Sequence, residues 1–81
     1  MARILDLKKW RKFLKSQGLI FKRSVGGHEI WDYPDDSLLR PVIYSAHDKE
    51  IAIYQITTNL KTLNLTMEDL DIWLGRSSHR P

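Results

Sequence analysis

The chain has 81 residues and a mass of 9.6 kDa, and its 42% hydrophobic and 28% charged residues are typical of one small folded domain. It contains no cysteine, which excludes disulfides, thiolate nucleophiles and cysteine-ligated metal sites. No stretch is as long and apolar as a membrane span, and the start lacks the apolar segment of a signal peptide, so we expect no membrane association.

Positive charge is concentrated at the start of the chain. Residues 1–23 contain eight basic residues and one acidic residue, whereas residues 24–81 contain five basic and nine acidic residues. The modest net charge of +3 therefore hides a strong separation of charge. A basic segment of this kind attracts phosphate backbones, although a solvated lysine-rich helix has the same pattern.

The first predicted helix spans Leu7–Gln17. Asp6 can cap its first turn, and Gly18 can end it. Apolar residues recur within it at intervals of three and four positions and predict one buried face. The outer face then carries Lys8, Lys12 and Lys15.

Three strands are predicted next. Residues 19–25 and 28–33 are rich in β-branched and aromatic residues and are separated by two glycines, a pattern that predicts a tight hairpin. After turn-forming residues at 34–37, residues 41–45 form a third strand-like run with proline only at its first position. These segments predict a three-stranded antiparallel meander.

Two helices should follow the sheet. Apolar residues at three- and four-residue spacing between Ile53 and Leu63 predict the first of them. Thr66 and Asp69 resemble a capping box that opens a short helix ending at Gly75. The residues of this short helix that we expect to pack inward are Leu70, Trp73 and Leu74.

The predicted order of elements is α-β-β-β-α with a short additional C-terminal helix. This order places the chain in the α+β class, with helices on one face of a three-stranded antiparallel sheet. We expect one domain over residues 1–75 and a tail over residues 76–81. Double-stranded-RNA-binding domains have the same order of elements.

Residue spacing argues against several common kinds of active site. The histidines lack the i, i+4 spacing of a helical metal site, and the glycine pair does not belong to a phosphate-binding loop motif. No serine lies in the context of a nucleophile elbow. We therefore predict neither a metal nor a cofactor.

His28 is the candidate catalytic residue. It follows Gly26 and Gly27, which would let a phosphodiester approach the backbone closely, and it lies near Lys22 and Arg23 in the sequence. A histidine can transfer a proton near neutral pH, as is required when an RNA 2′-hydroxyl attacks its adjacent phosphate. The alternative is a histidine that only begins a strand.

Strand alternation leaves the direction of His28 open. Burying Trp31 and Tyr33, which we expect in the core, would expose His28, whereas burying Ile30 would bury it. His47 lies in the loop after the third strand, where a histidine is usually solvated, and we assign it a possible supporting role.

Several segments of the chain occur in an order that suggests a known family. They are a basic first helix ending in Ser16–Leu19, the stretch Arg23–His28, the stretch His28–Trp31, the turn Pro34–Asp36 and the loop Ala46–Ile51. Together they resemble the HicA family of toxin–antitoxin toxins, in which the second of these stretches reads R-x-x-G-S-H and the loop carries histidine, lysine and glutamate. Members of this family are small, ribosome-independent mRNA interferases with a double-stranded-RNA-binding-domain-like fold.

The resemblance implies a toxin of a type II toxin–antitoxin system, an endoribonuclease that inhibits translation and growth, with His28 as its catalytic residue. It also implies a HicB-like antitoxin as partner and a cytoplasmic location in a bacterium or archaeon. We expect cleavage to need no metal. We predict that RNA is held by Lys8, Lys12, Lys15, Lys22, Arg23, Gly26 and Gly27.

Two positions depart from the family pattern. Gly27 stands where serine is usual, and residues 52–58 lack the frequent lysine-glycine-threonine sequence. Loss of the serine hydroxyl would remove a phosphate contact and reduce or alter activity. Two other functions fit the same sequence: a non-catalytic double-stranded-RNA-binding module, and an interaction module whose basic face binds an acidic protein.

Overall fold

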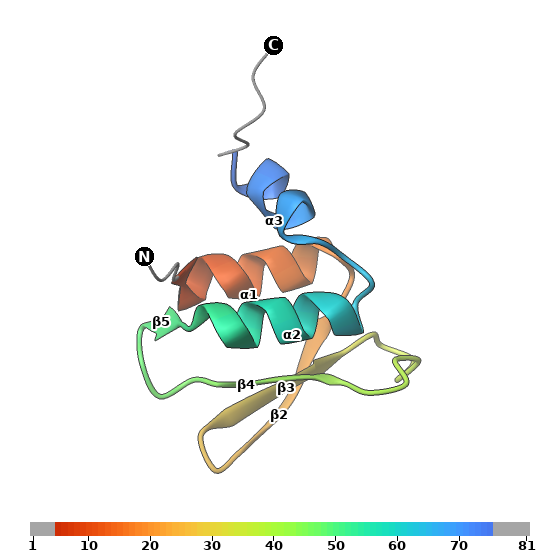
Figure 1. The fold of residues 1–81 in the computed structure, drawn as a ribbon. Helices are drawn as coiled ribbons and strands as arrows, with labels where there is room; N and C mark the ends of the chain where they lie inside the picture. Colours follow the sequence, from red (N-terminus) through yellow and green to blue (C-terminus); the bar gives the residue numbers. More distant parts are fainter. Residues whose placement is uncertain (1–4, 76–81) are drawn as a thin grey trace.

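The computed structural model describes residues 5–75 and confirms the α+β class (Figure 1). Three antiparallel strands form a sheet in the order β2-β3-β4, α1 and α2 lie side by side over one face of it, and α3 lies on the far side of α1. Within this part of the chain, no helix has the length and apolar character needed to span a bilayer. The elements are, in chain order, β1 (Leu5–Asp6), α1 (Leu7–Ser16), β2 (Ile20–Val25), β3 (His28–Asp32), β4 (Val42–Ser45), β5 (Glu50–Ile51), α2 (Ile53–Thr62) and α3 (Met67–Leu74).

Helix α1 begins where its sequence predicts and ends one residue earlier. The carboxylate of Asp6 accepts a hydrogen bond from Lys8 N (2.8 Å) and so caps the first turn. The chain leaves the helix after Ser16 and turns at Gly18, whose φ of +95° favours glycine. The buried residues of this helix are Leu7, Trp10, Phe13 and Leu14.

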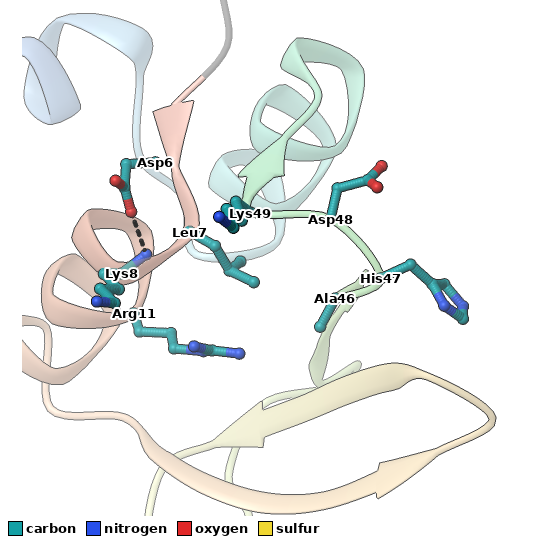
Figure 2. A pocket seen from close by; sticks show the side chains of 8 residues that line it. All are labelled: Asp6, Leu7, Lys8, Arg11, Ala46, His47, Asp48 and Lys49. Atoms are coloured by element: carbon teal, nitrogen blue, oxygen red, sulfur yellow. Dashed lines mark hydrogen bonds between the residues drawn. The ribbon is translucent and has the colours of Figure 1, made fainter.

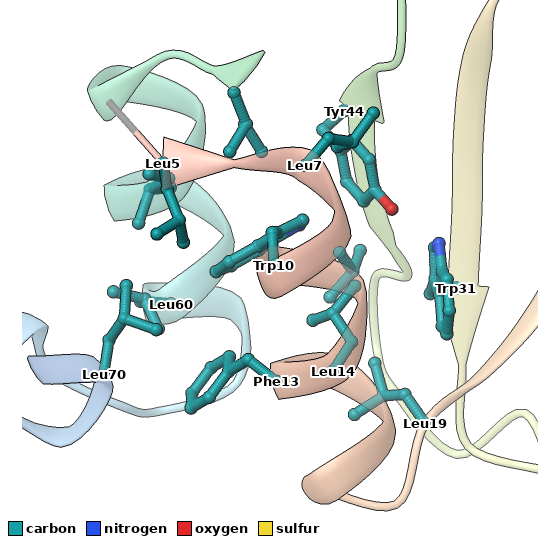
Figure 3. Close-up of a cluster of buried hydrophobic side chains, with 13 residues drawn as sticks. Leu5, Leu7, Trp10, Phe13, Leu14, Leu19, Trp31, Tyr44, Leu60 and Leu70 are labelled. Carbon is teal, nitrogen blue, oxygen red and sulfur yellow. The ribbon is translucent and has the colours of Figure 1, made fainter. Parts of the chain in front are cut away.

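The core centres on Trp10 of α1, which is fully buried and whose ring extends toward α2 (Figure 3). Its ring lies against Phe13 on the same helix and against the edge of Tyr44 on β4, at centroid distances of 5.7 and 6.1 Å. Trp31 on β3 is only 2% exposed, which confirms it as a core residue. Because Trp31 faces α1, the residues that alternate with it face the other side of the sheet. On that side Ile30 is 8% exposed and His28 is exposed, so the expectation that a buried Ile30 would bury His28 is wrong.

The hairpin of β2 and β3 has the predicted two-glycine turn. Gly26 and Gly27 both have positive φ (+56° and +83°), as a type I′ turn requires. Val25 and His28 pair on either side of the turn. The register shifts once, between Phe21 and Arg23, which places a bulge in β2.

Strand β3 ends at Asp32, one residue earlier than predicted. The buried carboxylate of Asp32 accepts hydrogen bonds from the amides of Tyr33 (2.6 Å) and Leu38 (3.1 Å). These bonds turn the chain away from the sheet. Tyr33 consequently lies outside the strand and packs against the core in a half-buried position.

Helix α2 covers one edge of the sheet with two side-chain amides. The amide of Asn59 accepts a hydrogen bond from Ile43 N (3.2 Å) and donates one to Ile43 O (2.9 Å), and Gln55 accepts one from Ser45 N (3.2 Å). The side chains thus occupy the place of a fourth strand along β4. The apolar spacing of α2 did not predict this contact, because Asn59 is a polar residue on the buried face.

A second strand pairing ties the start of the described chain to the loop after β4. Leu5 on β1 pairs with Ile51 on β5, and both side chains are buried. Leu7 N also donates a hydrogen bond to Lys49 O (2.8 Å). The sequence did not predict these strands, because two residues are too few to show alternation. Their pairing fixes the loop of residues 46–49 against the start of α1.

Helix α3 has the predicted capping box. Thr66 N donates to Asp69 Oδ2 (2.8 Å), and Asp69 N donates to Thr66 Oγ1 (3.2 Å). Leu70 is fully buried as expected. Trp73 packs inward only in part, because it remains 38% exposed while its ring lies edge-on to Phe13 at 5.5 Å.

Replacing Asn59 with alanine should lower the free energy of unfolding by about 2 kcal/mol, because hydrogen bonds worth about 0.5 to 1.5 kcal/mol each are lost. Urea unfolding measures the change. Thr58→Ala is a matched control, since Thr58 is exposed and its hydroxyl bonds only the Tyr54 carbonyl of its own helix (2.8 Å). That control should change the free energy by less than about 0.5 kcal/mol. Equal losses in the two variants would contradict the role of Asn59.

Candidate functional site

His28 and His47 meet at one end of the sheet. His28 begins β3 and pairs with Ser45, the last residue of β4. Ala46 N then donates a hydrogen bond to Gly27 O (2.8 Å), which continues the pairing into the loop. His47 therefore lies beside the hairpin turn, with its ring centroid 6.3 Å from that of His28 and the two ring planes at 88°. Both side chains are exposed.

Gly27 lies directly against the ring of His47. A Cβ atom added at position 27 would overlap the imidazole, and the Cε1 and Nε2 atoms would be nearest to it. The neighbouring Gly26, by contrast, has open space where a Cβ would lie. The imidazole of His47 therefore occupies the space that a side chain at position 27 would fill.

A pocket of about 410 Å³ adjoins His47 on the side of α1 (Figure 2). Lys8 and Arg11 line it from α1, and the loop of residues 46–49 lines it from the other side. Lys49 adds a third basic residue. The two acidic residues of the pocket are Asp6, whose carboxylate caps α1, and Asp48. The pocket thus places cationic groups on the α1 side of the loop that carries His47, and His28 does not line it.

Arg23 and Lys22, both predicted to contact RNA, lie in different places. Arg23 pairs with Ile30, which lies two residues beyond His28 on β3. Arg23 therefore shares the outer face of the sheet with His28. Lys22 lies in the bulge of β2, and its ammonium group contacts the Asp36 carboxylate (2.9 Å) and donates to the Pro34 carbonyl (3.3 Å). These contacts direct Lys22 toward the other end of the hairpin.

Lys12 and Lys15 are exposed on α1, which covers the sheet face opposite to that of His28. Lys15 borders a separate pocket of about 230 Å³ beside Phe21, and Lys12 lines neither pocket. The structure therefore does not bring these two lysines to the histidine pair. It groups the following predicted site residues near the hairpin end of the sheet: Arg23, Gly26, Gly27, His28 and His47. Lys8 shares the pocket next to His47 but lies on α1, across the sheet from the face of His28.

Arg11 and Glu29, which the sequence patterns did not indicate as site residues, form a partly buried ion pair next to this site. Arg11 Nε and Nη2 donate to the two carboxylate oxygens of Glu29 (3.0 and 2.6 Å), and the buried Tyr44 hydroxyl donates to the same carboxylate (2.7 Å). The bonds from Arg11 lower the pKa of Glu29, whereas burial and the bond to Glu29 raise the pKa of Tyr44. A signal was present, since Arg11 lies one turn after Leu7 on the buried stripe and Glu29 alternates with Trp31.

Comparisons of the chain with protein-family models, with curated proteins and with solved structures found no match. Within residues 5–75, no three histidine, cysteine or acidic side chains are grouped closely enough to hold a metal ion. What the site offers is two exposed imidazoles, a turn without side chains and nearby cationic groups. Such an arrangement can bind a phosphate and move protons.

Glu29→Gln should lower the free energy of unfolding by about 1 to 2 kcal/mol at pH 7 and by much less at pH 3. The hydrogen bonds from Arg11 hold the folded-state pKa of Glu29 below its ordinary value of 4.5, so the carboxylate stabilises the fold above that pH. This contribution is lost as the pH falls through the lower, folded-state pKa, because Glu29 then becomes protonated. Urea unfolding of both proteins across this range measures the difference.

Glu50→Gln is the control for this experiment, because Glu50 is an exposed carboxylate in β5. It should change the free energy of unfolding by less than about 0.5 kcal/mol at either pH. A loss in Glu29→Gln that is the same at pH 3 and pH 7 would show that the charge of Glu29 does not stabilise the fold.

Proposed function

We propose that the protein is a metal-independent endoribonuclease, a HicA-like toxin that cleaves mRNA with His28 as a proton-transfer group. The observation that carries the proposal is the exposed His28 beside a turn without side chains and a second imidazole, with Arg23 on the same face of the sheet and a basic pocket next to His47. The order α1-β2-β3-β4-α2 is that of a double-stranded-RNA-binding domain, which supports a fold of that kind.

The proposed reaction is attack of an RNA 2′-oxygen on its own adjacent phosphorus. The bond from the 2′-oxygen to phosphorus forms while the bond from phosphorus to the 5′-oxygen breaks, which leaves a 2′,3′-cyclic phosphate and a free 5′-hydroxyl. One proton leaves the 2′-oxygen and one proton reaches the 5′-oxygen, and His28 carries one of these transfers. Gly26 and Gly27 let the phosphate approach the backbone, and Arg23 and Lys8 stabilise its negative charge.

A HicB-like antitoxin is the proposed protein partner. Residues 1–23 carry a net charge of +7, so an acidic partner surface would be attracted to this part of the chain before contact. Such a partner inhibits the enzyme by covering His28 or by occupying the surface that binds RNA.

His28→Ala should abolish cleavage of a labelled single-stranded RNA, with a loss of at least about 100-fold, because a positioned acid or base contributes roughly 10² to 10⁴ to the rate. The assay is run in excess chelator, and the fold of the variant is checked by circular dichroism. Lys61→Ala is a control, since Lys61 is an exposed residue near the end of α2 and should leave the rate unchanged. DNA and a 2′-methoxy RNA of the same sequence should not be cleaved, because both lack the attacking hydroxyl.

The other outcomes of this assay separate the alternative functions. Undiminished cleavage by His28→Ala, or equal cleavage of DNA, would contradict the proposed chemistry. RNA binding without cleavage by the wild type would instead indicate a double-stranded-RNA-binding module. If the wild type neither binds nor cleaves RNA, the remaining alternative is a module that binds an acidic protein.

Lys8→Ala should weaken RNA binding more than Lys12→Ala, because Lys8 lines the pocket beside His47 and Lys12 does not. We expect loss of one phosphate contact to reduce the slope of log Kd against log salt concentration by about 1. Lys12→Ala is matched in charge and lies on the same helix. Binding is measured by fluorescence anisotropy with inactive His28→Ala protein at several salt concentrations. Equal effects of the two variants would place the RNA along the whole outer face of α1.

A further inference from the structure

We propose that His47 is a second catalytic residue, which carries the proton transfer that His28 does not. The inference rests on the proposed ribonuclease function and assigns a role at the same site. Cleavage by the 2′-hydroxyl needs one group to accept a proton and another to donate one, and a single imidazole cannot do both in one concerted step. The described structure brings one other imidazole next to His28, and it belongs to His47.

The distance between the two rings suits a phosphate held between them. Their centroids are 6.3 Å apart and their planes are nearly perpendicular. A hydrogen bond from each ring takes up about 2.9 Å, so one phosphodiester can contact both imidazoles at once after small side-chain rotations. Both side chains are exposed, which leaves the space between them open to RNA.

The loop that carries His47 is held at both ends. Ala46 N bonds to Gly27 O (2.8 Å) on one side, and Leu7 N bonds to Lys49 O (2.8 Å) on the other. The ring itself rests on Gly27, where any side chain would occupy its place. A solvated loop histidine needs none of these restraints, whereas a catalytic group must be positioned to within a fraction of an ångström.

The two histidines must start each turnover in opposite protonation states. The neutral ring accepts the proton of the 2′-hydroxyl, and the protonated ring gives its proton to the 5′-oxygen as the bond to phosphorus breaks. A plot of the cleavage rate against pH should therefore be bell-shaped, with its rising limb due to one histidine and its falling limb due to the other. The charged groups nearest to His47 are those that line its pocket, Asp6, Lys8, Arg11, Asp48 and Lys49, and Arg23 on β2 shares the outer face of the sheet with His28.

The test uses the full chain and two RNAs. One is an ordinary RNA, and the other has sulfur in place of the 5′-oxygen at the cleaved bond, so that its leaving group needs no proton. On ordinary RNA, His47→Ala should reduce kcat by at least about 100-fold with little change in KM, as should His28→Ala. On the sulfur-containing RNA, the variant that lacks the acid should regain its rate, and the other variant should not. Each variant should also lose one limb of the pH profile.

Gly27→Ser provides an independent readout. The new side chain should displace the His47 ring, which is seen as a shift of its ring signals in the NMR spectrum. It should reduce kcat toward that of His47→Ala even though it restores the serine of the HicA pattern, because the gain of a phosphate contact does not replace the lost proton transfer. Gly26→Ser is the matched control, because it also has positive φ but has open space around it. In a protein that already carries His47→Ala, adding Gly27→Ser should lower kcat no more than adding Gly26→Ser does.

The results distinguish this inference from the proposed function. If the wild type cleaves RNA and His28→Ala does not, while His47→Ala keeps the wild-type rate, the role of His47 is wrong and the ribonuclease remains. Recovery of both variants or of neither on the sulfur-containing RNA would also overturn the division of roles. If the wild type does not cleave RNA at all, both proposals fail together.

Discussion

Three elements of the fold are joined at one carboxylate. Glu29 on β3 accepts hydrogen bonds from Arg11 on α1 and from Tyr44 on β4, and its side chain is only 15% exposed. A carboxylate this deep would be costly without such donors, so α1 has to lie on the sheet where Arg11 reaches it. This placement turns Glu29 and Trp31 toward the helix and, by alternation, turns His28 outward. Ile30 shares that outer face and is only 8% exposed, so the exposure of His28 depends on its position next to the hairpin turn as well as on the contacts of Glu29.

The two edges of the sheet are protected in different ways. Along β4, the amides of Asn59 and Gln55 bind the backbone groups that another strand would otherwise reach. Along β2, a bulge and the basic side chains of Lys22 and Arg23 discourage pairing with another chain, even though Phe21 is 49% exposed there. Positive charge near the hairpin is thus useful to the fold itself, independently of any RNA.

The parts of this structure that could be predicted depend on residues close together in the sequence: the cap of α1, the two-glycine turn and the capping box of α3. The parts that were missed depend on distant partners. Leu5 finds Ile51 only once the chain has folded back, and Asn59 is polar on a buried face because the edge of β4 needs its amide. The residues of the candidate site also differ in whether a local signal in the sequence indicates them. A local motif was sufficient to select His28, whereas its proximity to His47 follows from the register of β3 and β4 and from one loop hydrogen bond, neither of which leaves a periodic signal.

The contact between Gly27 and His47 also constrains how this chain can change over generations. Because a side chain at position 27 would take the place of the imidazole, each of the two residues limits what the other can become. A lineage that acquires serine at position 27 while it still has histidine at position 47 must move the imidazole aside. Replacement of His47 first removes that overlap but not the strain of a side chain at a φ of +83°. The two residues, 20 positions apart in the sequence, are therefore expected to be inherited and exchanged as a pair.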